Sequence, residues 1–379
     1  MLRTSRSPKI ILLFFGSFLL TLSPLRAQEV KIEKKDGVII VHNPKEPVKK
    51  PGVPSSLELI RDLCIGDSPD DENYMFSQIG GVMVDKEEDI IVIDQKEVVI
   101  KVYDRNGKHL RTFGKRGGGP GEFNTASRIS LKGGKDIVVL DRGNNRLSYY
   151  SKDGECLQEI SLGKYTSISR AKPDSRGFIY ADTMTVDGDT GIYEIVKFDP
   201  EFNPIETLAK AEQVRKFPEV NPVPVWFMYL VMENDRFIWG WNADYELTIH
   251  DPDGRPVKKI TKDYDPVKIT KAEQEKIKEE SFGDMEIPDM IRIVYPKSYP
   301  PFFYFICDDI GQVYVRTQRE NDRGDLKWDV FDEEGVYILS FFLPPDELLY
   351  CIRKNCAYSF INEPEDGIPV VLRYQMDWN

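Results

Sequence analysis

Short apolar runs bounded by Asp or Gly recur along the chain. The run DIIVID at 89–94 returns as DIVVLD at 136–141 and as GFIYAD at 177–182, and weaker copies stand at 235–240 and 311–316. Each run is rich in β-branched and aromatic residues and has the length of a short strand. Because almost no stretch outside one insertion has a helical period, the pattern predicts an all-β protein.

A polar turn follows these runs. An aromatic residue or His leads into a turn that closes on Gly at 103–107, 150–154, 250–254 and 331–335. Asn-Gly and Asp-Gly supply the positive φ angles that tight hairpins need. The copy at 198–202 keeps the frame but has Phe202 where the others have Gly.

The spacing of the turns predicts the architecture. Gly107 and Gly154 are 47 residues apart, Phe202 follows 48 residues later, and Gly254 follows after another 52. Units of four short strands at this spacing are the blades of a β-propeller. We therefore predict a six-bladed β-propeller of four-stranded antiparallel blades, centred near 82–115, 129–162, 170–208, 227–262, 304–343 and 349–374.

The two ends of the chain are expected to close the ring. The last blade has only about three strands at the C-terminus, and the apolar segment 57–65 precedes the first blade. We predict that this N-terminal strand completes the last blade, which removes exposed sheet edges. Between blades 4 and 5, an insertion at about 264–300 contains the capping-box pattern Thr270-Lys271-Ala272-Glu273, which predicts a short polar helix ending near Ser281.

The first 27 residues have the features of a secretory signal peptide. Arg3, Arg6 and Lys9 precede an apolar stretch at 10–22 that is short for a membrane span, and 25–27 is a candidate cleavage site. The expected location is therefore the periplasm or the cell exterior. Residues 28–56 form an N-terminal leader whose prolines oppose regular structure, apart from a short outer strand at 38–41, and residues 57–379 form the propeller.

The composition is that of a globular chain. Of 379 residues, 41% are hydrophobic and 30% are charged, and 63 acidic against 51 basic residues give a net charge of -12. A net acidic surface disfavours nucleic acid or anionic lipid as the main partner. The five cysteines are too few for a disulfide framework. Cys351 and Cys356 could form one bridge, and the alternative is that all five are small buried hydrophobes.

The first two repeats resemble NHL repeats. The resemblance rests on VMVD at 82–85, the strands at 90–94 and 99–104, and LRTFG at 110–114 running into GGGPGEF at 117–123, with DRGNNRL at 141–147 in the second blade. Taken whole, the chain resembles exported six-bladed β-propeller proteins of Bacteroidetes-type bacteria, whose N-terminal Gly-apolar-Asn-Pro stretch is echoed by 37–44. The resemblance implies a fold more than an activity, because propellers host unrelated functions.

Polar residues gather in loops that are expected to share one rim. In a four-stranded blade, the loop between the second and third strands and the loop into the next blade open on the same face, which puts 141–145 beside 115–119. Charged, amide and aromatic groups around a funnel suit a carbohydrate or a peptide. The candidate ligand-binding residues are Asp94, Gln95, Lys115, Arg116, Arg142, Asn144, Asn145, Asp182 and Trp241.

A structural role is the alternative for the same residues. Asp94, Asp141 and Asp182 would cap strand ends by accepting backbone N–H bonds, and the arginines would tie blades together. Trp239 and Trp241 flank Gly240, and we expect one to face the core and the other the opposite side. The Gly-rich run at 117–121 lacks the Lys-Ser/Thr ending of a phosphate-binding loop, and we interpret it as a turn between blades.

Catalytic signatures are scarce. The chain has only three histidines, which is poor for the metal-dependent propeller lyases, and it lacks the G-x-S-x-G motif of serine hydrolases. Lactonase-like propellers use a central Ca²⁺ held by carboxylates and amides. In this chain Asp94, Asp141, Asn145 and Asp182 could approximate such a metal site.

The sequence therefore favours an exported, monomeric binding module. Its rim would hold a peptide, glycan or protein partner of the cell envelope, with no cofactor and no catalysis assigned. The alternative is a Ca²⁺-dependent propeller hydrolase or lyase.

Overall fold

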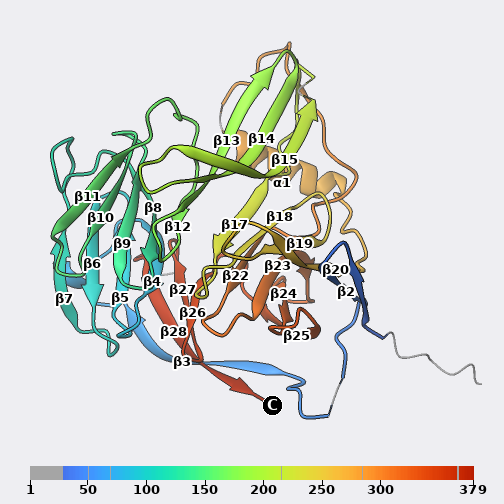
Figure 1. Cartoon of the computed structure of the whole chain (residues 1–379), viewed down its shortest axis with the longest axis horizontal. Helices are drawn as coiled ribbons and strands as arrows, with labels where there is room; N and C mark the ends of the chain where they lie inside the picture. Colours follow the sequence, from blue (N-terminus) through green and yellow to red (C-terminus); the bar gives the residue numbers. More distant parts are fainter. Residues whose placement is uncertain (1–28, 50, 69, 215, 284, 365–366) are drawn as a thin grey trace, which may run out of the picture.

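The computed structural model describes residues 29–49, 51–68, 70–214, 216–283, 285–364 and 367–379. Within these ranges the strands form seven sheets, and six of them are blades arranged around a common axis (Figure 1). Numbered in chain order, the first three blades are β4 (Ile79–Val84) to β7 (His109–Phe113) with β5 (Ile90–Asp94) and β6 (Val99–Tyr103) between them; β8 (Ala126–Lys132), β9 (Asp136–Asp141), β10 (Arg146–Tyr150) and β11 (Cys156–Ser161); and β12 (Ala171–Pro173), β13 (Ile179–Asp187), β14 (Thr190–Phe198) and β15 (Pro204–Val214).

The remaining three blades follow the same plan. They are β17 (Phe227–Val231), β18 (Phe237–Trp241), β19 (Glu246–His250) and β20 (Pro256–Lys262); β22 (Tyr304–Cys307), β23 (Val313–Glu320), β24 (Leu326–Phe331) and β25 (Tyr337–Leu343); and β26 (Leu348–Arg353), β27 (Cys356–Ile361), β28 (Val370–Trp378) and β3 (Leu57–Ile65). Every neighbouring pair within these four-stranded units is antiparallel. The predicted fold class is confirmed.

The innermost strands form a closed ring. Each contacts the innermost strand of the next blade, in the order β4, β8, β12, β17, β22 and β26, and β26 contacts β4 again. The apolar residues of the described chain accordingly divide into six clusters, and each lies between two adjacent blades. A single sheet cannot cover both of its faces, so the hydrophobic effect that stabilises the fold operates between blades.

The N-terminal strand completes the last blade as predicted. β3 pairs antiparallel with β28 from Leu57↔Trp378 to Ile65↔Val371. Ile65 is buried and packs with Phe76 and Val371 in the cluster between blades 6 and 1. The ring is therefore closed by hydrogen bonds between the two ends of the chain.

The leader adds more regular structure than the sequence indicated. β1 (Lys31–Lys35) and β2 (Val38–Asn43) form a hairpin, and β2 extends the outer edge of blade 4 by pairing parallel with β20. Asn43 is buried, and its Nδ2 donates to the carbonyls of Thr261 and Gly335 while its Oδ1 accepts from the Tyr337 N–H. One side chain thus connects the leader to blades 4 and 5.

The irregular turn at 198–202 is built without glycine. Phe202 has a φ of 66°, in the left-handed region that the glycines occupy in the other copies. Its ring is buried and stacks on Phe198 with the centroids 4.1 Å apart. Aromatic packing therefore offsets the backbone strain that a non-glycine residue incurs in this conformation.

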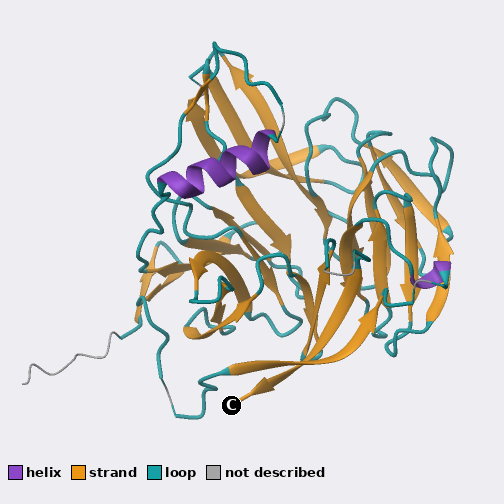
Figure 2. Cartoon of the chain, turned by 180° about the vertical axis from the view of Figure 1, so that it is seen from behind, coloured by secondary structure: helices purple, strands orange, loops and turns teal. Residues whose placement is uncertain are grey.

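The insertion between blades 4 and 5 contains the predicted helix. α1 (Lys271–Phe282) begins at Thr270, whose hydroxyl accepts from the Glu273 N–H while the Glu273 carboxylate accepts from the Thr270 N–H. Figure 2 shows α1 beside the strands, together with the short 3-10 turn η1 (Glu72–Tyr74). Two further short strands, β16 (Glu219–Val220) and β21 (Arg292–Ile293), pair in parallel.

Some sequence expectations concern other features of the chain. The signal-peptide prediction for residues 1–27 lies outside the described residues. Within the described ranges, none of the helices has the length and apolarity needed to cross a membrane. Among the described residues, no cysteine forms a disulfide, and the possible bridge between Cys351 and Cys356 is absent.

The packing of β3 yields a matched pair of variants. Ile65 is 1% exposed, whereas Ile60 on the same strand is 48% exposed. Ile65→Ala is expected to lower the free energy of unfolding by about 2–5 kcal/mol, because it deletes buried methyl groups and leaves a cavity. Ile60→Ala should change it by less than about 0.5 kcal/mol. Urea unfolding measures both, and equal losses in the two variants would contradict the role of β3 in closing the core.

Candidate functional site

The loops expected to share one rim do lie together. Asn144 Nδ2 donates to the Gly117 carbonyl at 2.8 Å, and the Arg146 guanidinium donates to the Gly119 carbonyl at 2.9 Å. The loop after β9 and the loop from blade 1 to blade 2 are therefore in direct contact. The Gly-rich run is part of this connection between blades.

The conspicuous aspartates of the rim have structural partners. Asp94 is fully buried and accepts backbone N–H bonds from Ser77, Gln78, Lys96 and Glu97. Its position at the end of the second strand allows it to hold the residues that precede the first strand. The carboxylate is thus surrounded by backbone donors of its own blade.

Equivalent side chains act in the next three blades. Asp141 accepts from the N–H groups of Asn124 and Thr125, and Asp182 accepts from those of Ser169 and Arg170. In blade 4 an amide replaces the carboxylate, since Asn242 Oδ1 accepts from the Trp226 N–H at 2.8 Å. We call these four side chains, Asp94, Asp141, Asp182 and Asn242, the strand-end acceptors. They fix where each innermost strand begins.

The other predicted rim residues differ in their surroundings. Lys115 is exposed and pairs with Glu122 at 3.0 Å, Arg116 donates to the Lys96 carbonyl at 3.3 Å, and Asn145 Nδ2 donates to the Gly163 carbonyl at 2.8 Å. Arg142 is exposed. Most of these side chains therefore contact neighbouring loops and do not converge on a single point.

The prediction that Trp239 and Trp241 face opposite sides of the sheet was wrong. Trp239 and Trp241 both contact Phe227, with ring centroids 5.6 and 4.8 Å away. Residues two apart on a strand point to the same face, so both rings belong to the cluster between blades 3 and 4. Trp241 also packs against Tyr193.

The proposed metal ligands are not assembled into a cluster. Among the described residues, no three His, Cys, Asp or Glu side chains are placed to hold one ion together. Asp94, Asp141 and Asp182 each serve a different blade, and Asn145 donates its amide to a backbone carbonyl.

A larger site lies along the axis of the ring. A cavity of about 690 Å³ is lined by residues from the innermost strands of all six blades, by Gln78 and Trp226 just before two of these strands, and by Gln95 and Asn362 just after second strands. On β4, a Cβ at Gly81 would lie only 2.8 Å from the hydroxyl of Tyr350, which lines this central channel. The glycine therefore makes room for a channel-lining ring from blade 6.

Three cations line the channel, and no carboxylate of the described chain lines it beside them. They are Arg128 on β8, Arg170 just before β12, and Lys172 on β12. None of the described lining residues is Asp or Glu, and within the described chain none of the three cations forms an ion pair. Arg170 Nη1 donates to the Phe227 carbonyl at 3.0 Å, and Lys172 Nζ contacts the Ile129 carbonyl at 3.4 Å. The channel is electropositive inside a net acidic protein.

The crowding of these cations changes their protonation. Burial, together with the nearby guanidinium groups of Arg128 and Arg170, lowers the pKa of Lys172 from 10.5 to about 7. Burial and the Arg128 charge also lower the pKa of Arg170, although an arginine stays protonated in proteins. An anion bound between them would oppose both causes and raise the pKa of Lys172.

Comparison with known proteins supports the architecture. Residues 70–224 match a family described as "6-bladed beta-propeller". The chain is a six-bladed β-propeller. A protein from Bacteroides fragilis described, by inference, as exported is similar to it with a TM-score of 0.55 and 13% identity, over 90% of this chain and 99% of that one. A member of the duf4221 family from Bacteroides vulgatus is similar with a TM-score of 0.50 and 10% identity, over 86% and 99% of the two chains. At these identities the likeness shows the fold alone.

Sequence reasoning missed the cations of the propeller's channel. The residues predicted to bind a ligand lie mostly in loops, whereas Arg128 and Lys172 lie within short innermost strands. The first strand of a blade lies next to the axis, so a charged residue in that strand can line the channel. Charged residues in or directly before the strands at 126–132 and 171–173 were the signal that could have found this site.

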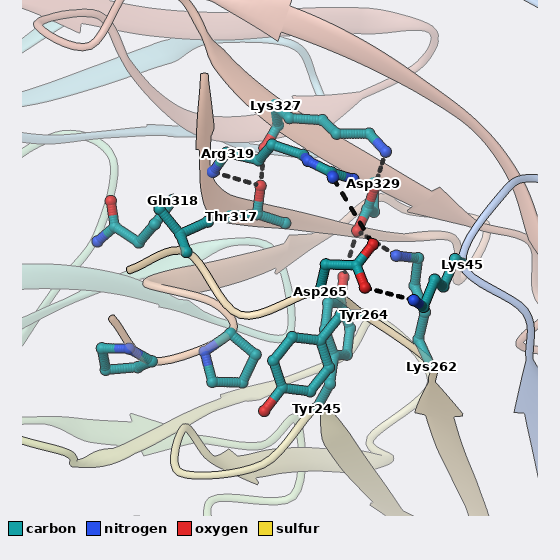
Figure 3. Close-up of a pocket in the computed structure, with 13 residues that line it drawn as sticks. Lys45, Tyr245, Lys262, Tyr264, Asp265, Thr317, Gln318, Arg319, Lys327 and Asp329 are labelled. Atoms are coloured by element: carbon teal, nitrogen blue, oxygen red, sulfur yellow. Dashed lines mark hydrogen bonds and ion pairs between the residues drawn. The ribbon is translucent and has the colours of Figure 1, made fainter. Parts of the chain in front are cut away.

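A second, smaller cavity contains a structural charge cluster (Figure 3). Asp329 is buried between the ammonium groups of Lys262 and Lys327, at 3.3 and 3.4 Å, and accepts from the hydroxyls of Tyr245 and Tyr337 at 2.8 Å. Burial lowers the pKa of Lys262 and raises that of Tyr245. The cavity measures about 30 Å³, enough for a water molecule. Its charged groups bind one another and join blades 4 and 5.

The strand-end acceptors can be tested at Asp141. Asp141→Ala is expected to lower the free energy of unfolding by about 1–3 kcal/mol, because the N–H groups of Asn124 and Thr125 lose their acceptor. Asp141→Asn keeps one acceptor oxygen and should lose less. Asp187→Ala, at an exposed position, is the control and should change stability by less than about 0.5 kcal/mol.

The same variants distinguish a structural role from metal binding. If Asp141 holds a metal, elemental mass spectrometry of the purified parent would find about one ion per chain, Asp141→Ala would lose that ion, and EDTA would destabilise the parent but not the variant. That result would contradict the structural role.

Proposed function

We propose that the protein is an exported binding module that holds an anionic ligand in the central channel of the propeller. The observation that carries the proposal is the set of three channel cations, Arg128, Arg170 and Lys172, with no carboxylate among the described lining residues. Burying unpaired charges is costly, and a concave site with convergent cations stabilises a bound anion. Export is supported by the signal-like pattern of residues 1–27 and by a structural neighbour described as exported.

The site proposed here differs from the rim expected from the sequence. The rim aspartates accept hydrogen bonds from their own blades, so they offer little to a peptide or glycan. Gln95 belongs to both regions, since it follows β5 and lines the channel. The rim therefore serves as the entrance and the channel as the binding site.

The Ca²⁺-dependent alternative receives less support. A calcium site needs several oxygen ligands directed at one point. The carboxylates available for such a site belong to separate blades, whereas the groups that converge in the channel are cations and amides. This charge pattern favours an anion over a metal ion.

Isothermal titration with inorganic pyrophosphate tests the proposal. The titration is run at pH 6, below the pKa of about 7 that burial gives Lys172, so that the amine is protonated, and EDTA is present throughout. Lys172→Met and Arg170→Gln should each weaken binding by about 10- to 100-fold, the value of a charge-assisted hydrogen bond. Lys276→Met on α1 removes an exposed charge and is the matched control. Equal affinities in Lys172→Met, Arg170→Gln and Lys276→Met would refute the proposal.

A further inference from the structure

We propose that the ligand of the central channel is a small amphipathic anion, with an acidic head held by the channel cations and an apolar body held by the opposite wall. This inference rests on the proposed function and names the ligand class for the same channel. It follows from how the cations and the apolar side chains are distributed around the axis.

The cations come from one side of the ring. Arg128 belongs to blade 2, and Arg170 and Lys172 belong to the start of blade 3. In the closed order β4, β8, β12, β17, β22, β26, strand β8 lies across the axis from β22, and β12 lies across from β26. The channel cations therefore face the innermost strands of blades 5 and 6.

The facing side is apolar. Its lining residues from β22 and β26 include Phe305, Ile306 and Leu348, and Met228, Leu230 and Val231 of β17 extend this apolar surface round to blade 3. Tyr304 and Tyr350 also line this side, and the Tyr304 hydroxyl donates to the Leu349 carbonyl at 2.9 Å. We call this surface the apolar wall. It offers aliphatic and aromatic contacts and few free polar atoms.

The thiols on this side remain neutral. Burial raises the pKa of Cys351 to about 11, and burial also raises that of Cys307. Neither thiol then supplies a negative charge to balance the channel cations near neutral pH. The apolar wall therefore stays uncharged, while the opposite side of the channel is positively charged.

The size and chemistry of the channel favour a small amphipathic molecule over a glycan. A cavity of about 690 Å³ falls in the range of small-molecule sites. A glycan carries hydroxyl groups over its whole surface, and the apolar wall would leave many of them without hydrogen bonds. A molecule with one charged end and one apolar end satisfies both sides of the channel.

Fluorescence titration with anilinonaphthalene sulfonate, an aromatic sulfonate, tests this inference on the folded full chain. Lys172→Met and Arg170→Gln should weaken its binding at least about tenfold relative to the Lys276→Met control. Leu348→Asn, a change of similar volume that adds polarity to the apolar wall, should weaken the dye severalfold and leave pyrophosphate affinity unchanged. Phenylnaphthylamine, an uncharged analogue, should bind at least about tenfold more weakly than the sulfonate.

The outcomes separate the inference from the proposed function. If pyrophosphate binding depends on Lys172 and Arg170 but Leu348→Asn leaves dye binding unchanged, the channel holds an anion and the amphipathic class is wrong. If phenylnaphthylamine binds as tightly as the sulfonate, the head is not recognised and the inference fails. If neither pyrophosphate nor the dye responds to Lys172→Met or Arg170→Gln, the proposed function fails as well.

Discussion

A buried acceptor at the end of the second strand determines where the innermost strand begins in blades 1 to 4. Asp94, Asp182 and Asn242 accept the N–H groups of Gln78, Arg170 and Trp226, and these three residues line the channel. The interaction that organises each blade therefore also positions the wall of the proposed site. Because Asp182 uses its oxygens on backbone N–H groups, Ser169 and Tyr229, it forms no ion pair with the Arg170 guanidinium among the described contacts. The Arg170 guanidinium thus stays without an ion pair in the described part of the channel, although the protein has a net negative charge.

The fold could be predicted from the sequence because the repeat is local. Each Asp- or Gly-bounded strand and each Gly turn specifies a hairpin by backbone geometry alone, and the missing strand of the last blade could be sought at the other end of the chain. The hairpin at β1 and β2 was predicted less completely, because its pairing with β20 depends on the edge of a distant blade. Phe202 shows that tertiary packing can replace glycine where the turn frame is retained.

The site could be predicted only in part. The contact between the loops at 115–122 and 141–146 was predicted, because their place in a blade fixes their side of the ring. Whether Asp94 or Asp141 faces a ligand or backbone donors depends on loop conformation, which no spacing in the sequence reveals. The grouping of Arg128 with Lys172 arises from two blades meeting at the axis. The sequence of either strand alone does not predict that the two side chains lie close together, because their proximity arises only when the ring closes.

A crystal structure of the protein with a triiodinated isophthalate would test the central claim most directly. This aromatic dicarboxylate has an acidic edge and a heavy-atom body, so anomalous scattering from iodine locates both the site and its orientation. We expect iodine peaks in the channel against Leu348 and Phe305, with a carboxylate directed at Arg170 and Lys172. Iodine bound only on the outer surface, or the reverse orientation in the channel, would contradict it.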